Sequence, residues 1–142
     1  MSYISIHTAL SDRLQTVVGL PTLQEENNRV RLGNGDIWSR ATLLPAKTNI
    51  QTIGPNGFNQ LNGLYQVDLF YPSDTGYTEP YNMVDLILAS FVAGTVLGQI
   101  RIKNSYMISS HDLSRTDKVM PNYFILPVMI EWETYEQRPT IT

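Results

Sequence analysis

His111 and Asp112 are the only adjacent histidine and carboxylate in the sequence, and such a pair could perform general acid–base chemistry. That chemistry needs both side chains in a pocket, with a third group that orients the histidine. The surrounding residues are serines, Arg115, Thr116 and Asp117, which are typical of turns. We therefore expect a solvated loop here, and a small hydrolase that uses this pair is kept as an alternative of a different class.

A metal site is not indicated by the remaining candidate ligands. His7, the second histidine, is distant from His111 in the sequence, and the chain contains no cysteine. Protein zinc sites usually combine several histidines and cysteines at short spacings. The lack of cysteine also excludes disulfides and thiol nucleophiles.

Charged residues on predicted strands are the other candidates for function. Asp68, Glu131 and Glu133 are expected on solvated strand faces. In a homo-oligomer such acids can form ion pairs with basic residues of the next subunit. The arginines considered for these contacts are Arg29, Arg31, Arg40 and Arg101.

The charge balance argues against a protein that binds nucleic acid tightly. The formal net charge is −3 at pH 7, and the ten Lys and Arg residues are scattered. Binding to phosphates depends on clustered basic side chains.

The length of 142 residues and the 42% hydrophobic content suit one domain, spanning 1–142. The start of the chain is not typical of a signal peptide, and no apolar run reaches roughly 18 residues, so we expect no membrane association.

Two helices should help to position these residues. Apolar residues at helical spacing predict one helix over 2–18, with Gly19 near its end. A second helix is predicted from Thr78, its expected N-cap, to about Val92. Its apolar stripe comprises Tyr81, Val84, Ile87, Leu88 and Phe91.

Strands are predicted where apolar and polar residues alternate. Residues 29–32 and 37–44 flank Asn34-Gly35, a dipeptide that favours tight turns, and therefore predict a β-hairpin. A further strand is predicted at 64–71, within the extended segment 63–72. The sequence predicts the α+β class, with a mostly antiparallel or mixed sheet packed against the two helices.

The last two strands are predicted at 99–108 and 123–135. The second should expose Glu131 and Glu133, and Pro127 implies a sheet edge or a bulge because proline lacks an amide donor. The inward side of the first comprises Ile100, Ile102, Tyr106 and Ile108. The inward side of the second comprises Phe124, Leu126, Val128, Ile130 and Trp132.

A long polar stretch, about 46–62, joins two predicted strands, and connections of this length are usually functional or disordered. We expect a flexible β-hairpin arm with Pro55-Asn56-Gly57 at its tip, and a polar tail at about 137–142. The candidate partner contacts in the arm are Ile53, Pro55, Asn56 and Phe58. Aromatic residues at element ends that could anchor an interface are Tyr3, Trp38, Phe58, Tyr77 and Tyr135.

The order of these elements resembles the tail terminator proteins of long-tailed bacteriophages over nearly the whole chain. Its most specific parts are the segment 63–72 followed by Gly76, the segment 123–128, and Pro21-Thr22 after the first helix. The resemblance implies a small α+β subunit that forms a ring, expected to be a homo-hexamer, on the head-proximal end of the tail tube.

Such a ring stops tube polymerisation and provides the head–tail joining surface. The resemblance also implies a non-enzymatic virion protein of the tail or neck that is assembled in the host cytoplasm and binds no cofactor. Its partners would be other copies of itself, the tail tube protein and head–tail connector proteins. Genome DNA would pass through the channel without sequence-specific binding.

The close alternatives are another neck component, such as a head–tail connector, and a subunit of the tail tube. The resemblance transfers no functional residues, so the interface residues are inferred from the sequence alone. They are Arg29, Arg31, Arg40, Ile53, Pro55, Asn56, Phe58, Asp68, Arg101, Glu131 and Glu133.

Overall fold

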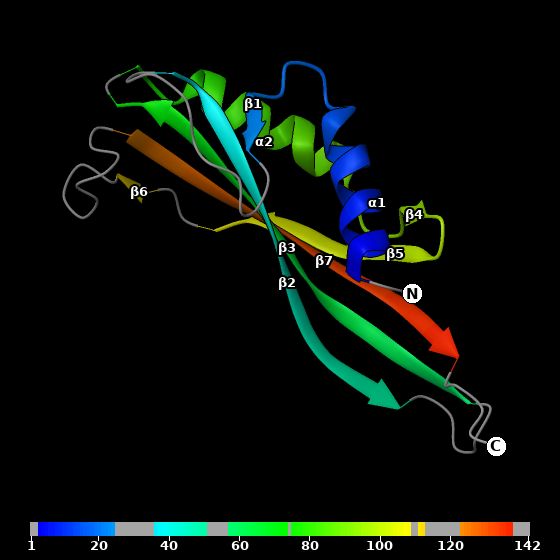
Figure 1. The fold of residues 1–142 in the computed structure, drawn as a ribbon. Helices are drawn as coiled ribbons and strands as arrows, with labels where there is room; N and C mark the ends of the chain where they lie inside the picture. The colour runs from blue at the N-terminus through cyan, green and yellow to red at the C-terminus, as the bar shows by residue number, and fades with distance from the viewer. Residues whose placement is uncertain are drawn as a thin grey trace.

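A computed structural model describes residues 3–24, 36–50, 57–73, 75–108, 111–112 and 123–137. Within these residues, two helices accompany one mixed sheet, which confirms the α+β class (Figure 1). In chain order the elements are α1 (Tyr3–Gln15), β1 (Thr22–Gln24), β2 (Trp38–Ile50), β3 (Phe58–Pro72), α2 (Thr78–Ser90), β4 (Val96–Leu97), β5 (Ile100–Met107), β6 (His111–Asp112) and β7 (Tyr123–Gln137).

The sheet is built around β3 and β7, which pair antiparallel along their whole lengths, from Phe58 opposite Gln137 to Pro72 opposite Tyr123. Within the described residues the strand order is β1-β2-β3-β7-β5-β4, and β6 pairs with β7 beyond the end of β5. The β1–β2 pair is parallel, and the other pairs are antiparallel.

Both helices pack against one face of this sheet. Alternate residues of β3 and β7 point toward the helices, so the inward positions of each strand are apolar. Burial of this apolar surface is the main force that holds the layers together. The core includes Ile6, Leu10 and Leu14 of α1, Val84 and Ile87 of α2, Tyr65, Val67 and Leu69 of β3, and Leu126, Val128, Ile130 and Trp132 of β7.

The helices are shorter than predicted, and α2 differs in detail. Tyr77, rather than Thr78, occupies the N-cap position and makes no side-chain capping bond. Met83 is buried, whereas Tyr81 and Leu88 are only partly buried. The buried stripe is thus rotated slightly from the predicted one.

The pairing of β2 corrects the predicted hairpin between 29–32 and 37–44. Residues Trp38–Arg40 of β2 lie between β1, which is parallel, and β3, which is antiparallel, so both edges are occupied there. Leu23 of β1 packs against the core in this arrangement. The packing of Leu23 takes precedence over the local Asn34-Gly35 signal, and residues 29–32 lie outside the described residues.

A register shift in β5 overturns part of its predicted alternation. The shift lies between Ile102 and Asn104, so the residues after it are displaced by one position. Met107 packs against the core, whereas Tyr106 is 39% exposed. The prediction that Tyr106 and Ile108 share a face with Ile102 is therefore wrong.

Pro127 does not lie in an edge strand, because β7 is flanked on both sides. Its carbonyl accepts a hydrogen bond from the amide of Ile108 at 2.9 Å. The amide nitrogen and the carbonyl of a residue in an antiparallel strand face the same neighbour. The nitrogen of Pro127, which carries no hydrogen to donate, therefore faces the interval between Met107 of β5 and His111 of β6. A break between two partner strands accommodates this proline.

Candidate assembly surface

The sheet face opposite the helices carries most of the described candidates, and we call it the open face. Strand alternation places Asp68 of β3 and Glu133 of β7 on it, because their neighbours in sequence point into the core. Arg40 and Arg101 lie directly opposite these acids in the register. The open face is thus crossed by two pairs of opposite charge.

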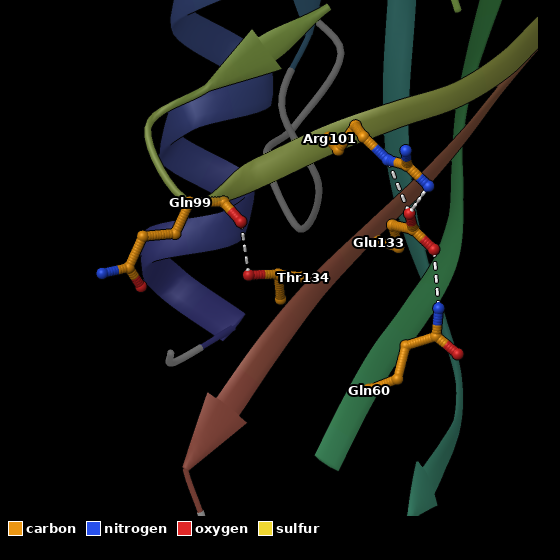
Figure 2. A network of polar contacts seen from close by, with 5 residues as sticks. All are labelled: Gln60, Gln99, Arg101, Glu133 and Thr134. Carbon is orange, nitrogen blue, oxygen red and sulfur yellow. Dashed lines mark hydrogen bonds and ion pairs between the residues drawn. The ribbon is translucent and has the colours of Figure 1, made fainter. Parts of the chain in front are cut away.

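Glu133 is the centre of a network that joins three strands (Figure 2). Its Oε1 accepts a hydrogen bond from Arg101 Nε at 2.6 Å and a second bond from the Nη2 group of the same guanidinium. Its Oε2 accepts a bond from Gln60 Nε2 at 2.6 Å. The Glu133 side chain is only 3% exposed, against 60% for Arg101. Both carboxylate oxygens are hydrogen-bonded, as a buried charge requires.

Burial of Glu133 contradicts the prediction that it lies on a solvated face. The adjacent residue, Thr134, is also buried and donates a hydrogen bond from Oγ1 to the carbonyl of Gln99 at 2.7 Å (Figure 2). Consecutive residues of a strand point to opposite faces. At this point β7 is therefore fastened to the β5 region by side chains on both faces of the sheet.

The second ion pair joins β2 to β3. Arg40 Nη2 lies 3.4 Å from Asp68 Oδ2, and Gln66 Nε2 donates to Asp68 Oδ1 at 2.8 Å. The Arg40 guanidinium also lies over the Phe70 ring, 5.3 Å from its centroid. Asp68 is buried by these neighbours, which contradicts the prediction that it lies on a solvated face. Arg40 and Arg101, which were considered for ion pairs with another subunit, each have a partner within the chain, directly opposite in the register.

A small aromatic cluster occupies one end of the open face. Trp38 stacks on Phe70 with ring centroids 4.0 Å apart, and Tyr123 and Ile125 complete the cluster. The Tyr123 hydroxyl donates to the carbonyl of Asp36 at 2.9 Å. Trp38 is 1% exposed, so it serves as a core residue rather than an interface anchor. The other predicted aromatic anchors are exposed, namely Tyr3, Phe58, Tyr77 and Tyr135.

At the other end, β2, β3 and β7 extend beyond both helices (Figure 1). The hairpin expected from β2 and β3 is joined by β7, as Asn59 pairs with both Ile50 and Glu136. We call residues 46–50, 58–62 and 133–137 the three-stranded arm. On its open face, Phe58 and Tyr135 occupy diagonal register positions and are 46% and 49% exposed.

The root of the arm is closely packed around Gly63. A Cβ atom at this position would lie 2.6 Å from the Leu44 carbonyl oxygen and 2.8 Å from Trp132 Cζ2. Only glycine leaves room for the Trp132 ring against the β2 backbone. A register shift in β2 between Pro45 and Thr48 lies beside this point.

The remaining candidates are less defined. Arg29, Arg31, Ile53, Pro55 and Asn56 lie outside the described residues. Glu131 is half-buried and helps to line a pocket of about 230 Å³, together with Lys103, Gly63 and Trp132. Sequence reasoning missed Gln60, Gln66, Gln99 and Thr134. The spacing of Gln66 and Asp68, which places both on one strand face, was a usable signal.

His111 and Asp112 form the short strand β6, opposite Ile125 and Phe124 of β7, rather than the expected loop. Among the described residues, no group of three or more His, Cys, Asp or Glu could hold a metal ion. Within the same residues, no helix combines the length and apolarity needed to cross a bilayer.

Burial raises the pKa of the Tyr71 hydroxyl, and the Glu79 carboxylate raises it further.

Comparisons with known proteins agree with this architecture. A family model described as phage tail terminator protein matches residues 5–132. One solved structure is similar over 94% of this chain and 96% of its own, with 16% sequence identity and a TM-score of 0.67, which shows a shared fold. A search of curated proteins finds no match.

Proposed function

Because the chain belongs to the phage tail terminator family, we propose that it forms a ring on the head-proximal end of the tail tube. The family is a structural one, so the chain is a component of the phage tail. In the proposal, the ring contains six copies, stops polymerisation of the tube and provides the joining surface for the head. Its partners are the tail tube protein and the head–tail connector proteins, and it assembles in the host cytoplasm.

The observation that carries the proposal is the family match over residues 5–132, which includes nearly every described element. The shape of the subunit supports it physically. A closed ring of more than two copies needs two different contact surfaces on each subunit. The three-stranded arm is one such candidate, because it extends beyond the helices and exposes Phe58 and Tyr135.

The charges of the open face are compatible with a channel for DNA. Arg40 and Arg101 are paired with Asp68 and Glu133, and the chain as a whole carries −3. Affinity for DNA comes largely from Lys and Arg that neutralise phosphates. We propose that genome DNA passes this subunit without sequence-specific binding.

Capping can be tested with purified components. Tail tube protein is polymerised with and without this chain, and the products are examined by negative-stain electron microscopy. The proposal predicts that this chain alone forms rings, and that adding it to growing tubes shortens them and leaves a ring at one end. Filaments of this chain alone would identify a tube subunit instead. Unaltered tube lengths, with no ring on any end, would contradict capping.

A further inference from the structure

The Glu133 network lies at the place where the arm leaves the helix-covered sheet. Trp132, which packs on Gly63, is the last large core residue of β7, and Glu133 follows it directly. The final β5–β7 pair is Ile100 with Thr134. Among the described residues, the end of β7 beyond Thr134 pairs with β3 alone. The network therefore marks the boundary between the supported sheet and the arm.

We propose that Glu133, Arg101 and Gln60 form a clamp that fixes the direction of the three-stranded arm. They are positioning residues for the contact that the arm makes with the next copy of this chain. The clamp joins β3, β7 and β5, so it ties two arm strands to a strand that stays in the body of the sheet. The contact itself rests on the proposed function, whereas the clamp can be tested on the isolated subunit.

The burial of Glu133 makes its carboxylate dependent on Arg101 and Gln60. A carboxylate that is 3% exposed needs hydrogen bonds to both oxygens, and here Arg101 serves one oxygen and Gln60 the other. An arm that turned away from β5 would separate Glu133 from Arg101. The cost of leaving that carboxylate without its partner therefore opposes movement of the arm.

The clamp also lies beside the exposed aromatic residues. Gln60 is directly opposite Tyr135 in the register, and it is two residues from Phe58 on the same strand face. Thr134 holds the opposite face through its bond to Gln99. The orientation of Phe58 and Tyr135 relative to the sheet is thereby set by groups on both faces.

The occupant of this surface is a second copy of this chain, because the ring of the proposed function requires two different contact surfaces on each subunit, and the arm extends beyond the helices as one of them. The clamp leaves no unneutralised positive charge at Arg101 to attract phosphate, and the exposed arm face offers Phe58 and Tyr135. Aromatic side chains beside satisfied polar groups are typical of protein–protein contacts.

Hydrogen exchange on the purified full-length chain tests the clamp. Glu133→Gln and Arg101→Gln break it, and Arg101→Lys keeps the charge but not the two-donor geometry. Arg40→Gln is the matched control, since it breaks the other cross-strand pair on the same face. We expect amide exchange in 58–62 and 134–137 to rise about tenfold in the two clamp-breaking variants. Exchange in 65–70 and 126–131 should not change, and Arg101→Lys should be intermediate.

The same variants are then tested for ring formation by electron microscopy. We expect fewer rings for Glu133→Gln and Arg101→Gln, partial recovery for Arg101→Lys, and normal rings for Arg40→Gln. Unchanged exchange in the arm, or an equal increase throughout the chain, would overturn the clamp. Faster exchange in the arm with normal rings would overturn its role in positioning. Wild-type protein that forms no ring would instead contradict the proposed function. In that case the exchange data would still test whether the clamp holds the arm.

Discussion

At the scale of single residues, the arm root depends on one small residue and one buried charge. Gly63 allows Trp132 to pack on the β2 backbone, and Glu133 is held by Arg101 and Gln60 on the opposite face. These contacts lie within two neighbouring register positions of β7. A change at either position is expected to act on the arm before it acts on the distant aromatic cluster.

Replacement of Gly63 by alanine should destabilise the protein. The added methyl group would meet the Leu44 carbonyl at 2.6 Å and the Trp132 ring at 2.8 Å, so the backbone or the ring must shift. Overpacking of this kind costs about 1–3 kcal/mol of the free energy of unfolding. Urea unfolding measures the loss, with Asn62→Ala as the control on the other strand face. Equal stability of Gly63→Ala and wild type would contradict the close packing.

Tyr71 should give the protein a specific weakness at high pH. Its pKa is raised above the ordinary value of 10.0 in the folded state, so the unfolded chain loses this proton first. The free energy of unfolding should therefore be unaffected by Tyr71 below about pH 10, and should fall as the pH rises above that value.

Urea unfolding over the range of about pH 9–11 tests this dependence on Tyr71. Tyr71→Phe should reduce the alkaline loss of stability, whereas Tyr106→Phe, at a position 39% exposed in the wild type, should retain it. An identical pH dependence for wild type and Tyr71→Phe would exclude the raised pKa as its cause.

At the scale of elements, the irregular points of the sheet determine which residues are buried and which are exposed. The shift in β5 turns Met107 inward and Tyr106 outward. In β2, the strand is interrupted at Pro45 and the adjacent register shift. Beyond Arg40, β3 is the partner of β2 among the described residues. Prolines and bulges discourage strand addition at sheet edges. Contacts of the arm are accordingly expected through side chains rather than through added strands.

The β5 shift predicts opposite sensitivities for two adjacent residues. Met107→Ala should cost about 1–2 kcal/mol, less than for a fully buried methionine because Met107 is only partly buried. Tyr106→Ala should cost less than about 1 kcal/mol, as expected for a more exposed position. Thermal unfolding of both variants compares them directly. A larger loss for Tyr106→Ala would restore the uninterrupted alternation that the sequence suggests.

The regular parts of these elements could be predicted from sequence, because buried and exposed residues alternate along a regular strand. Leu126, Val128, Ile130 and Trp132 are buried as expected. The position of Glu133 could not be predicted, because its burial depends on the register that brings Arg101 and Gln60 to it. The parallel β1 could not be predicted either, since it depends on packing of Leu23 rather than on a local turn signal. Candidate residues and possible ion-pair partners were found by charge type, but the sequence did not show that Arg40 and Arg101 pair with Asp68 and Glu133 within one chain.

At the scale of the whole molecule, the subunit combines a helix-covered sheet with an arm at one end. The helices enclose the core on one face, and the arm reaches past them (Figure 1). In our proposal this division separates folding from assembly, because the large buried side chains lie mostly outside the arm. Assembly can then be altered at the arm while the core stays intact.

Shortening the arm should abolish capping but not folding. Asn49 and Gln60 lie opposite each other, so residues 50–59 can be replaced by an Asn-Gly turn that closes the hairpin directly. Circular dichroism and thermal unfolding should resemble wild type, whereas the shortened chain should fail to cap tubes. A second variant, in which only Phe58 is replaced by serine, keeps the arm at full length and tests how much of this loss comes from the exposed ring. Normal capping by the shortened chain would remove the arm from the mechanism.

The most direct test of the central claim is the length of tail tubes in cells that produce all phage proteins except this chain. Electron microscopy of these lysates scores tube length and attachment to heads against wild type. Our account predicts overlong tubes without heads, because nothing ends polymerisation. Tails of normal length that fail to join heads, or a complete lack of tubes, would contradict it and indicate a connector or a tube component instead.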